Sequence, residues 1–167
     1  AYKEAVEILY GLSYTIKMGK KNGAQPEGYF EYVVPPLEGL WWFDDNNPFD
    51  GNINKIIERK DDFCWIMMIR QPEFVTHEVF ESAKVALSKK KPELDTSKAR
   101  LEDFTEGLCA QVMHTGPYDD EPATVSLLED FIKSQGYRTE MSGLRQHHEI
   151  YLSDPRKTAP DKLKTVI

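Results

Sequence analysis

Apolar residues recur at helical spacing in three stretches of the chain. In the first, the spacing places Ile8, Leu12 and Ile16 on one stripe. The second begins after Thr76, a good N-cap residue, and ends before Pro92. The third has a proline in its first turn and a glycine after its last, which is common at helix ends. The pattern therefore predicts helices over residues 3–19, 76–91 and 120–135.

Runs typical of strands stand between these helices. Residues 63–69, FCWIMMI, are apolar without interruption, the pattern of a strand that is buried on both faces. The other runs are rich in aromatic and branched residues and end in clusters of Gly, Pro, Asp or Asn. A short helix is predicted over residues 52–60. The predicted strands are 29–43, with a break at Pro35-Pro36, 63–69, 104–114 and 137–152, and residues 163–167 would enter a last strand.

The order of these elements indicates an α+β fold with an internal duplication. Residues 1–70 form a strand-helix-strand-strand module without its opening strand, and residues 100–167 form a second module without its closing strand. The helix within residues 71–99 connects them. The chain is thus predicted to be a single domain of two related halves, which agrees with its length of 167 residues.

Composition narrows the possible partners. The net charge of −7 argues against binding to a phosphate backbone, and therefore against nucleic acid. No apolar run approaches the ~18 residues of a membrane span, and no signal peptide opens the chain. Cys64 and Cys109 stand apart in apolar runs, which favours reduced thiols and a cytoplasmic protein. His147 and His148 alternate across a strand and cannot chelate together, so neither a metal nor another cofactor is expected.

The segment HHEIYLSDP carries the most informative polar side chains. In a strand, His147, Glu149 and Tyr151 share one face. A solvated face would explain this arrangement, and so would a ligand pocket. Trp41, Trp42 and Trp65 are many tryptophans for strands of a small protein. Alternation along the strand allows only one of Trp41 and Trp42 to face such a pocket.

An aromatic cleft would change the chemistry of Glu149. Its candidate lining residues are Trp41, Trp65, Tyr29, Phe104, Tyr118 and Tyr151. Burial among rings would raise the pKa of the carboxyl group unless cations or hydrogen bonds compensate. A carboxylate beside ring faces suits a flat lipophilic cation, and the same carboxylate could act as a general base toward water. Both uses stay open at this stage.

Three stretches of the chain resemble the GyrI-like small-molecule-binding family. They are EGYFEYVVPPLEGLWW, VMHTGPYDDEPATVSLLEDFIKSQGY and HHEIYLSDPRKTAPDKLKTVI. This superfamily includes the DNA gyrase inhibitor and the effector-binding domains of some multidrug-responsive transcription regulators. The His-x-Gly-Pro-Tyr turn and the Glu-x-Tyr-Leu-x-Asp-Pro ending carry the resemblance most specifically. It is strongest from about residue 107 onward.

The resemblance implies a fold and a ligand site. The family fold is a tandem pair of strand-helix-strand-strand modules with an antiparallel sheet and a central cleft, and it suggests that the native protein extends beyond both ends of this chain. In the family, a glutamate on the penultimate strand meets cationic or polycyclic aromatic ligands in that cleft. Glu149 is the matching position. The resemblance therefore implies a cleft that binds drugs or other xenobiotics.

The chain looks like the stand-alone members of the family, because no helix-turn-helix domain precedes the resembling segments. Some such members are associated with hydrolysis of cyclopropane-containing DNA-alkylating natural products, which is a detoxification. By this analogy Glu149 would be the general base, and Tyr118, Tyr151 or His147 would orient water or polarise a ligand carbonyl. The resemblance also implies an aromatic wall that would stack on the ligand. The wall would consist of Trp41, Trp65 and Tyr29, and Phe104 would bind the ligand beside it.

Three functions follow as alternatives. The protein could sequester its ligand, could hydrolyse it, or could be an interaction module that docks on DNA gyrase or on a transcription regulator. An exposed acidic patch such as residues 119–121 would mark the interaction module, although acidic residues there are also expected at a helix N-terminus. The sequence leaves the physiological ligand and the oligomeric state open.

Overall fold

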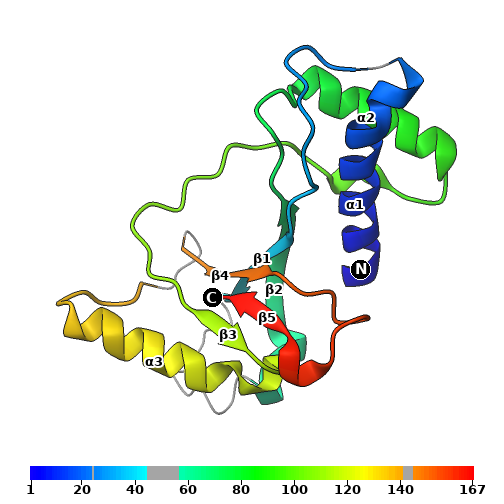
Figure 1. Ribbon diagram of the computed structural model, residues 1–167. Coiled ribbons are helices and arrows are strands. Elements are labelled where there is room, and N and C mark those ends of the chain that lie inside the picture. Colours follow the sequence, from blue (N-terminus) through cyan, green and yellow to red (C-terminus); the bar gives the residue numbers. More distant parts are fainter. Residues whose placement is uncertain (24, 45–56, 141–144) are drawn as a thin grey trace. The chain divides into compact units, whose positions relative to one another are not determined.

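The computed structural model describes most of the chain and separates it into two compact units (Figure 1). The described residues are 1–23, 25–44, 57–140 and 145–167. Unit 1 comprises Ala1–Leu37 and Met67–Phe104, and unit 2 comprises Glu38–Ile66 and Thr105–Ile167. Within the described ranges there are three α-helices and a five-stranded sheet, so the α+β class is confirmed. The tandem duplication stays a prediction.

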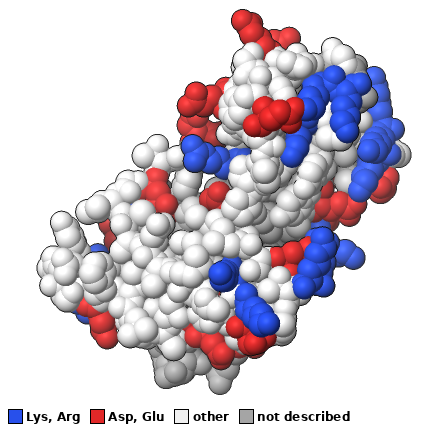
Figure 2. All heavy atoms as spheres, in the orientation of Figure 1, with Lys and Arg blue, Asp and Glu red and all other residues white. Residues whose placement is uncertain are grey.

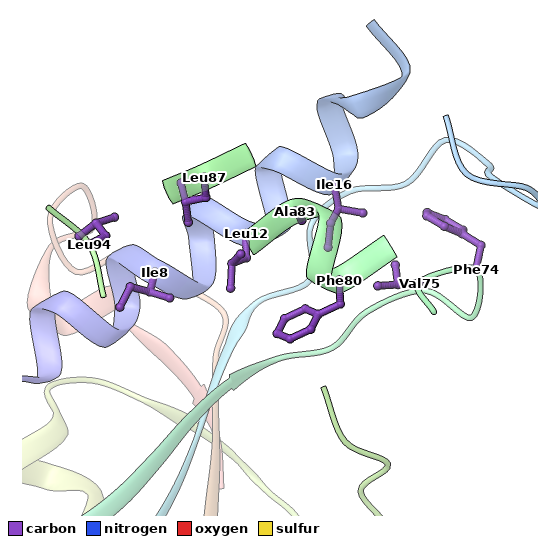
Figure 3. Close-up of a cluster of buried hydrophobic side chains, with 9 residues drawn as sticks. All are labelled: Ile8, Leu12, Ile16, Phe74, Val75, Phe80, Ala83, Leu87 and Leu94. Carbon is purple, nitrogen blue, oxygen red and sulfur yellow. The ribbon is translucent and has the colours of Figure 1, made fainter. Parts of the chain in front are cut away.

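Unit 1 is built on the packing of α1 (Tyr2–Met18) against α2 (His77–Lys90). Figure 3 shows the buried side chains of both helices meeting in one cluster. A Cβ atom at Gly11 would lie 3.0 Å from Leu87 Cδ2, so glycine permits the close approach of the two helices. The cluster consists of Ile8, Leu12, Ile16, Phe74, Val75, Phe80, Ala83, Leu87 and Leu94.

The ends of the helices in unit 1 follow the sequence signals. The Thr76 hydroxyl accepts a hydrogen bond from the Val79 N–H at 3.3 Å, which confirms the predicted N-cap of α2. At the other end, Lys91 Nζ lies 2.6 Å from Glu7 Oε1 of α1. The hydrogen bond between the two side chains, and then their opposite charges, raise the pKa of Lys91 and lower that of Glu7.

The strand predicted before the break at Pro35-Pro36, over residues 29–34, is wrong. These residues form no strand or helix, and the strand begins only at Leu37. The rings of Tyr29, Phe30 and Tyr32 instead surround Phe74, with centroid distances of 5.2, 5.5 and 5.7 Å. Prolines 35 and 36 have no N–H group for a sheet, and the aromatic side chains gain more by packing on the hydrophobic cluster.

Most of the five-stranded sheet belongs to unit 2, and the order of its strands is β2-β1-β4-β5-β3. Strand β5 pairs antiparallel with both of its neighbours, so that Thr165 lies opposite His114 on one side and Tyr151 on the other. Residues 164–166, where the sequence predicted only the entry into a last strand, therefore form a paired central strand. The strands are β1 (Leu37–Phe43), β2 (Phe63–Ile69), β3 (Met113–Thr115), β4 (His147–Tyr151) and β5 (Lys164–Val166).

The strands β3 and β4 are shorter than the predicted ranges 104–114 and 137–152. The residues before β3 run without regular structure through Gly107, whose φ is +77°. The Arg145 guanidinium donates to the carbonyl oxygens of Glu106 (3.3 Å) and Leu108 (2.6 Å). A side chain thus satisfies backbone acceptors that a strand partner would otherwise satisfy. Of the range predicted for β4, residues 141–144 lie outside the described residues.

The remaining elements of unit 2 are helical. Helix α3 (Glu121–Ser134) has Pro122 in its first turn, and Gly136 follows it with φ +79°, as the sequence predicted. Of the short helix predicted over residues 52–60, residues 52–56 lie outside the described residues, and Ile57–Asp62 forms a kinked 3₁₀ segment.

Charges of both signs lie together on the visible face of unit 1 (Figure 2). Figure 2 shows lysine and arginine side chains over the α1 and α2 region, interspersed with aspartate and glutamate. Such mixing is typical of a solvated surface. Among the described helices, none is long and apolar enough to cross a membrane. Likewise, in the described part of the chain no three His, Cys, Asp or Glu side chains are grouped to hold a metal ion.

Candidate functional site

The strand β4 presents its polar side chains on two opposite faces of the sheet. His147, Glu149 and Tyr151 alternate onto one face, which we call the Glu149 face, and His148 points to the other. On the Glu149 face, His147 Nε2 lies 3.1 Å from Glu149 Oε1. The Tyr151 hydroxyl donates to Glu149 Oε2 at 2.7 Å. Both carboxylate oxygens are thus held by neighbours on the same strand.

Trp41 of β1 extends this group across the sheet. Its indole Nε1–H donates to the Tyr151 hydroxyl oxygen at 2.8 Å, although 110 positions separate the two residues in the sequence. Trp41 therefore lies on the Glu149 face, and Trp42 alternates to the opposite one. The Glu149 side chain is 13% exposed, so the carboxylate is shielded but still reachable from solvent.

Aromatic rings continue along the Glu149 face over β1 and β2. The rings of Trp41 and Phe63 meet edge to face at 5.8 Å, and Phe63 stacks on Phe43 at 4.5 Å. The Arg59 guanidinium lies 4.4 Å from the centre of the Phe43 ring. Trp65, two residues after Phe63 on β2, alternates onto the same face. The sheet thus places a carboxylate beside a row of rings.

Sequence reasoning missed Phe43, Phe63 and Arg59. The two phenylalanines stand two positions from the tryptophans it did select, so strict alternation along β1 and β2 could have found them. No pattern in the sequence predicts that Arg59 lies over Phe43, because Arg59 belongs to a connecting segment whose course depends on tertiary packing.

Tyr118, another tyrosine predicted for the site, contacts Tyr151 from the turn between β3 and α3. Tyr118 begins a short 3₁₀ helix (Tyr118–Asp120), and its ring meets Tyr151 edge to face at 6.1 Å. The turn is held by His114, which is 4% exposed. His114 Nε2 lies 3.1 Å from the Pro117 carbonyl oxygen, and Nδ1 lies 2.8 Å from the Thr124 hydroxyl.

These contacts explain the His-x-Gly-Pro-Tyr motif. A carbonyl only accepts, so His114 donates from Nε2–H to Pro117, and its Nδ1 shares the second hydrogen bond with the Thr124 hydroxyl. Gly116 takes a φ of +139°, a conformation that side-chain-bearing residues rarely adopt. His114 therefore links β3 to α3 and fixes the turn that presents Tyr118. The motif marked this turn in the sequence, but nothing there predicted that His114 holds it by two hydrogen bonds.

Two predicted ligand-binding residues belong to unit 1. Tyr29 packs its ring against Phe74, 5.2 Å between centroids, beside the hydrophobic cluster of that unit. Phe104 is the last residue of unit 1, and it is exposed. The group around Glu149 is formed within unit 2 without either of them, and their part in ligand binding stays a prediction.

The opposite face of the sheet carries a second ionisable group. His148 Nε2 lies 2.9 Å from Glu38 Oε2 of β1, and Nδ1 lies 2.9 Å from Glu106 Oε1. Burial alone would lower the pKa of His148, but the hydrogen bonds and charges of Glu38 and Glu106 outweigh burial and raise it above its ordinary value. The sequence predicted that His147 and His148 face apart, and did not predict this bridge.

The acidic run at residues 119–121 lies at the start of α3. Asp119 and Asp120 belong to the 3₁₀ helix, and Glu121 is the first residue of α3. Negative charge is favourable at that end of a helix, so these residues have a structural explanation. The role of an interaction module stays a prediction.

The described residues thus form an α+β fold whose Glu149 face places one carboxylate beside several aromatic rings. The chain belongs to the family of GyrI-like small molecule binding domains, whose model matches residues 2–167. The resemblance inferred from the three sequence stretches is therefore confirmed.

Solved structures from Listeria innocua are similar over nearly the whole chain. A hydrolase from that organism is 44% identical, with a TM-score of 0.85, and the match covers 99% of this chain and 76% of that one. An uncharacterized conserved protein is 45% identical, with a TM-score of 0.86 and coverages of 99% and 77%. A second hydrolase structure is 44% identical, with a TM-score of 0.83 and the same coverages. None of the curated proteins compared with the chain matches it.

Proposed function

We propose that this protein binds flat lipophilic or cationic small molecules, such as drugs or other xenobiotics, on the Glu149 face. The support is the carboxylate of Glu149 beside the rings of Trp41, Phe63 and Tyr151. Ring faces and a partly buried anion together attract planar cations by cation–π and Coulomb interactions. Membership of a small-molecule-binding family agrees with this use of the face.

We further propose that the protein hydrolyses cyclopropane-containing DNA-alkylating compounds. The observation that carries this proposal is the carboxylate of Glu149, oriented by the hydroxyl of Tyr151 and the imidazole of His147. A carboxylate held in this way can remove a proton from water. The similarity to two solved hydrolases supports a hydrolase over a binding protein that only sequesters its ligand.

The proposed reaction adds one water molecule to the ring. The water oxygen bonds to a cyclopropane carbon while a ring C–C bond breaks, and that electron pair moves into the conjugated carbonyl. Glu149 takes the proton from the water, and the proton then returns to the product. Tyr118 and His147 orient the water or polarise the carbonyl, while Trp41 and Trp65 stack on the planar part of the ligand.

A turnover assay tests this function directly. The purified protein is incubated with a cyclopropane-bearing DNA alkylator, and the products are analysed by mass. We expect the wild type to form the adduct of compound plus water and Glu149→Gln to form at least about a hundredfold less, the lower end of the contribution of a general base. Gln146→Ala is a matched control on a neighbouring position. Quenching of tryptophan fluorescence without any mass change would identify a sequestering protein instead.

A further inference from the structure

The hydrogen bond between Trp41 and Tyr151 gives the tryptophan a role other than stacking on a ligand. We propose that Trp41 is a positioning residue, whose indole N–H fixes the Tyr151 hydroxyl so that its hydrogen points at Glu149. This inference rests on the proposed role of Glu149 as the ligand-facing anion. It concerns how that anion is held in place, and it distinguishes Trp41 from the other rings of the Glu149 face.

The direction of the hydrogen bonds follows from the groups involved. An indole nitrogen can only donate, and a phenol has one hydrogen to give. Trp41 Nε1 lies 2.8 Å from the Tyr151 oxygen, so the phenol must accept there. The phenol hydrogen then lies along the 2.7 Å contact to Glu149 Oε2. The chain of donors therefore runs from Trp41 through Tyr151 to the carboxylate.

The surroundings favour a strong and fixed arrangement. Trp41, Glu149 and Tyr151 are each half-buried, and hydrogen bonds in series strengthen one another where water is partly excluded. The edge-to-face contact with Phe63 sets the plane of the indole and so the direction of its N–H. The indole is attached to β1 and the carboxylate to β4, so the link also ties two adjacent strands.

A phenylalanine would preserve a flat apolar wall but not this link. Without the indole donor, the Tyr151 hydroxyl could rotate away from Glu149 toward water or ligand. The negative charge would then lose one of the two contacts that orient it, the other being His147 at 3.1 Å. Trp41→Phe therefore separates the positioning role from the stacking role within a single side chain.

The first test needs no ligand. The protein has three tryptophans, so ¹⁵N labelling of the indoles gives three side-chain N–H signals, and Trp41→Phe assigns one of them. We expect Tyr151→Phe to shift that signal upfield and to speed its exchange with solvent, while the signals of Trp42 and Trp65 stay in place. An unchanged Trp41 signal in Tyr151→Phe would overturn the inference, whatever the protein binds.

The second test uses ethidium, a planar aromatic cation, as the probe. We expect Trp41→Phe to weaken ethidium binding about threefold to tenfold, as the loss of one hydrogen bond would. In the Glu149→Gln background the same substitution should have no further effect, because the charge that Trp41 positions is gone. Trp42→Phe, on the opposite face, is the control and should bind like the wild type.

The two tests separate the failure of the inference from the failure of the proposed function. If Trp41→Phe weakens ethidium binding equally in the wild-type and Glu149→Gln backgrounds, Trp41 only stacks on the ligand and the positioning role is overturned. Wild-type protein that binds no ethidium, and turns over no alkylator, would refute the proposed function. The Trp41 N–H signal would then still decide whether the link from Trp41 to Tyr151 exists.

Discussion

At the scale of single residues, His148 shows how a partly buried imidazole is stabilised by two carboxylates. Glu38 reaches it from β1 and Glu106 from the segment before β3, each at 2.9 Å. Because these partners outweigh the effect of burial, the pKa of His148 is raised in the folded protein. A histidine whose pKa is raised in the folded protein contributes to stability at pH values below its unfolded-state pKa of about 6.5. This contribution is lost as pH rises through the folded-state pKa.

We therefore predict a pH-dependent contribution of His148 to stability. His148→Gln should lower the free energy of unfolding by about 1–3 kcal/mol at pH 6, the range for hydrogen bonds that involve charged groups. The difference from the wild type should shrink as pH rises above the raised pKa. Urea unfolding of both proteins from pH 6 to pH 9 measures it. A difference that stays constant over this range would contradict the prediction.

Asp154 is a second ionisable residue with a clear perturbation. The Arg156 side chain and backbone N–H both donate to its carboxylate and lower its pKa to about 2. A carboxyl group whose pKa is lowered in the folded protein contributes to stability at pH values above its unfolded-state pKa. This contribution is lost as pH falls through the folded-state pKa. Since the pair is at the surface, its contribution is small, and it matters only under strongly acidic conditions.

At the scale of elements, the turn between β3 and α3 depends on one buried imidazole. We predict that His114→Ala destabilises the protein by about 2–4 kcal/mol, because it removes two hydrogen bonds at a nearly inaccessible site. Thr124→Val removes only one of them and should cost less, about 1 kcal/mol. Urea unfolding compares the two variants. Equal costs would mean that the link to Pro117 contributes nothing.

The contact between α1 and α2 gives a second prediction at this scale. Leu87 is 2% exposed and faces Gly11, so Leu87→Ala should cost about 2–5 kcal/mol through the cavity that it leaves. Val85, on the same helix, is 55% exposed, and Val85→Ala should change stability by less than about 0.5 kcal/mol. Thermal unfolding of both variants checks the difference, and similar costs would refute the assigned packing.

At the scale of the whole molecule, what the sequence could predict depended on the range of the interactions. The helices were predicted well because their signals, such as the Thr76 cap and the Gly136 stop, are local. The choice between Trp41 and Trp42 requires the pairing of β1 with β4, which no local pattern contains. The packing of Tyr29 on Phe74 was not predicted, because aromatic composition does not distinguish a ring in a core from a ring in a ligand site.

The net charge gives a prediction for the molecule as a whole. With a net charge of −7, the protein should attract a cationic ligand from a distance, and dissolved salt should weaken this attraction. We expect the association rate of ethidium to fall several-fold as ionic strength rises from about 10 mM to about 500 mM. A neutral planar compound should show little change. Stopped-flow fluorescence measures both rates, and equal salt dependence would show that long-range attraction does not assist binding.

The position of β5 has a consequence for how the protein is made. This strand lies between β4 and β3, and the backbone of Ile167 pairs with that of Val112. Among the described strands, β3 pairs only with β5, so β3 has no partner and β4 lacks one of its two until residues 164–166 have left the ribosome. The sheet closes only when residues 164–167 emerge, so the nascent chain exposes unpaired strand edges until then and is vulnerable to aggregation and to proteases.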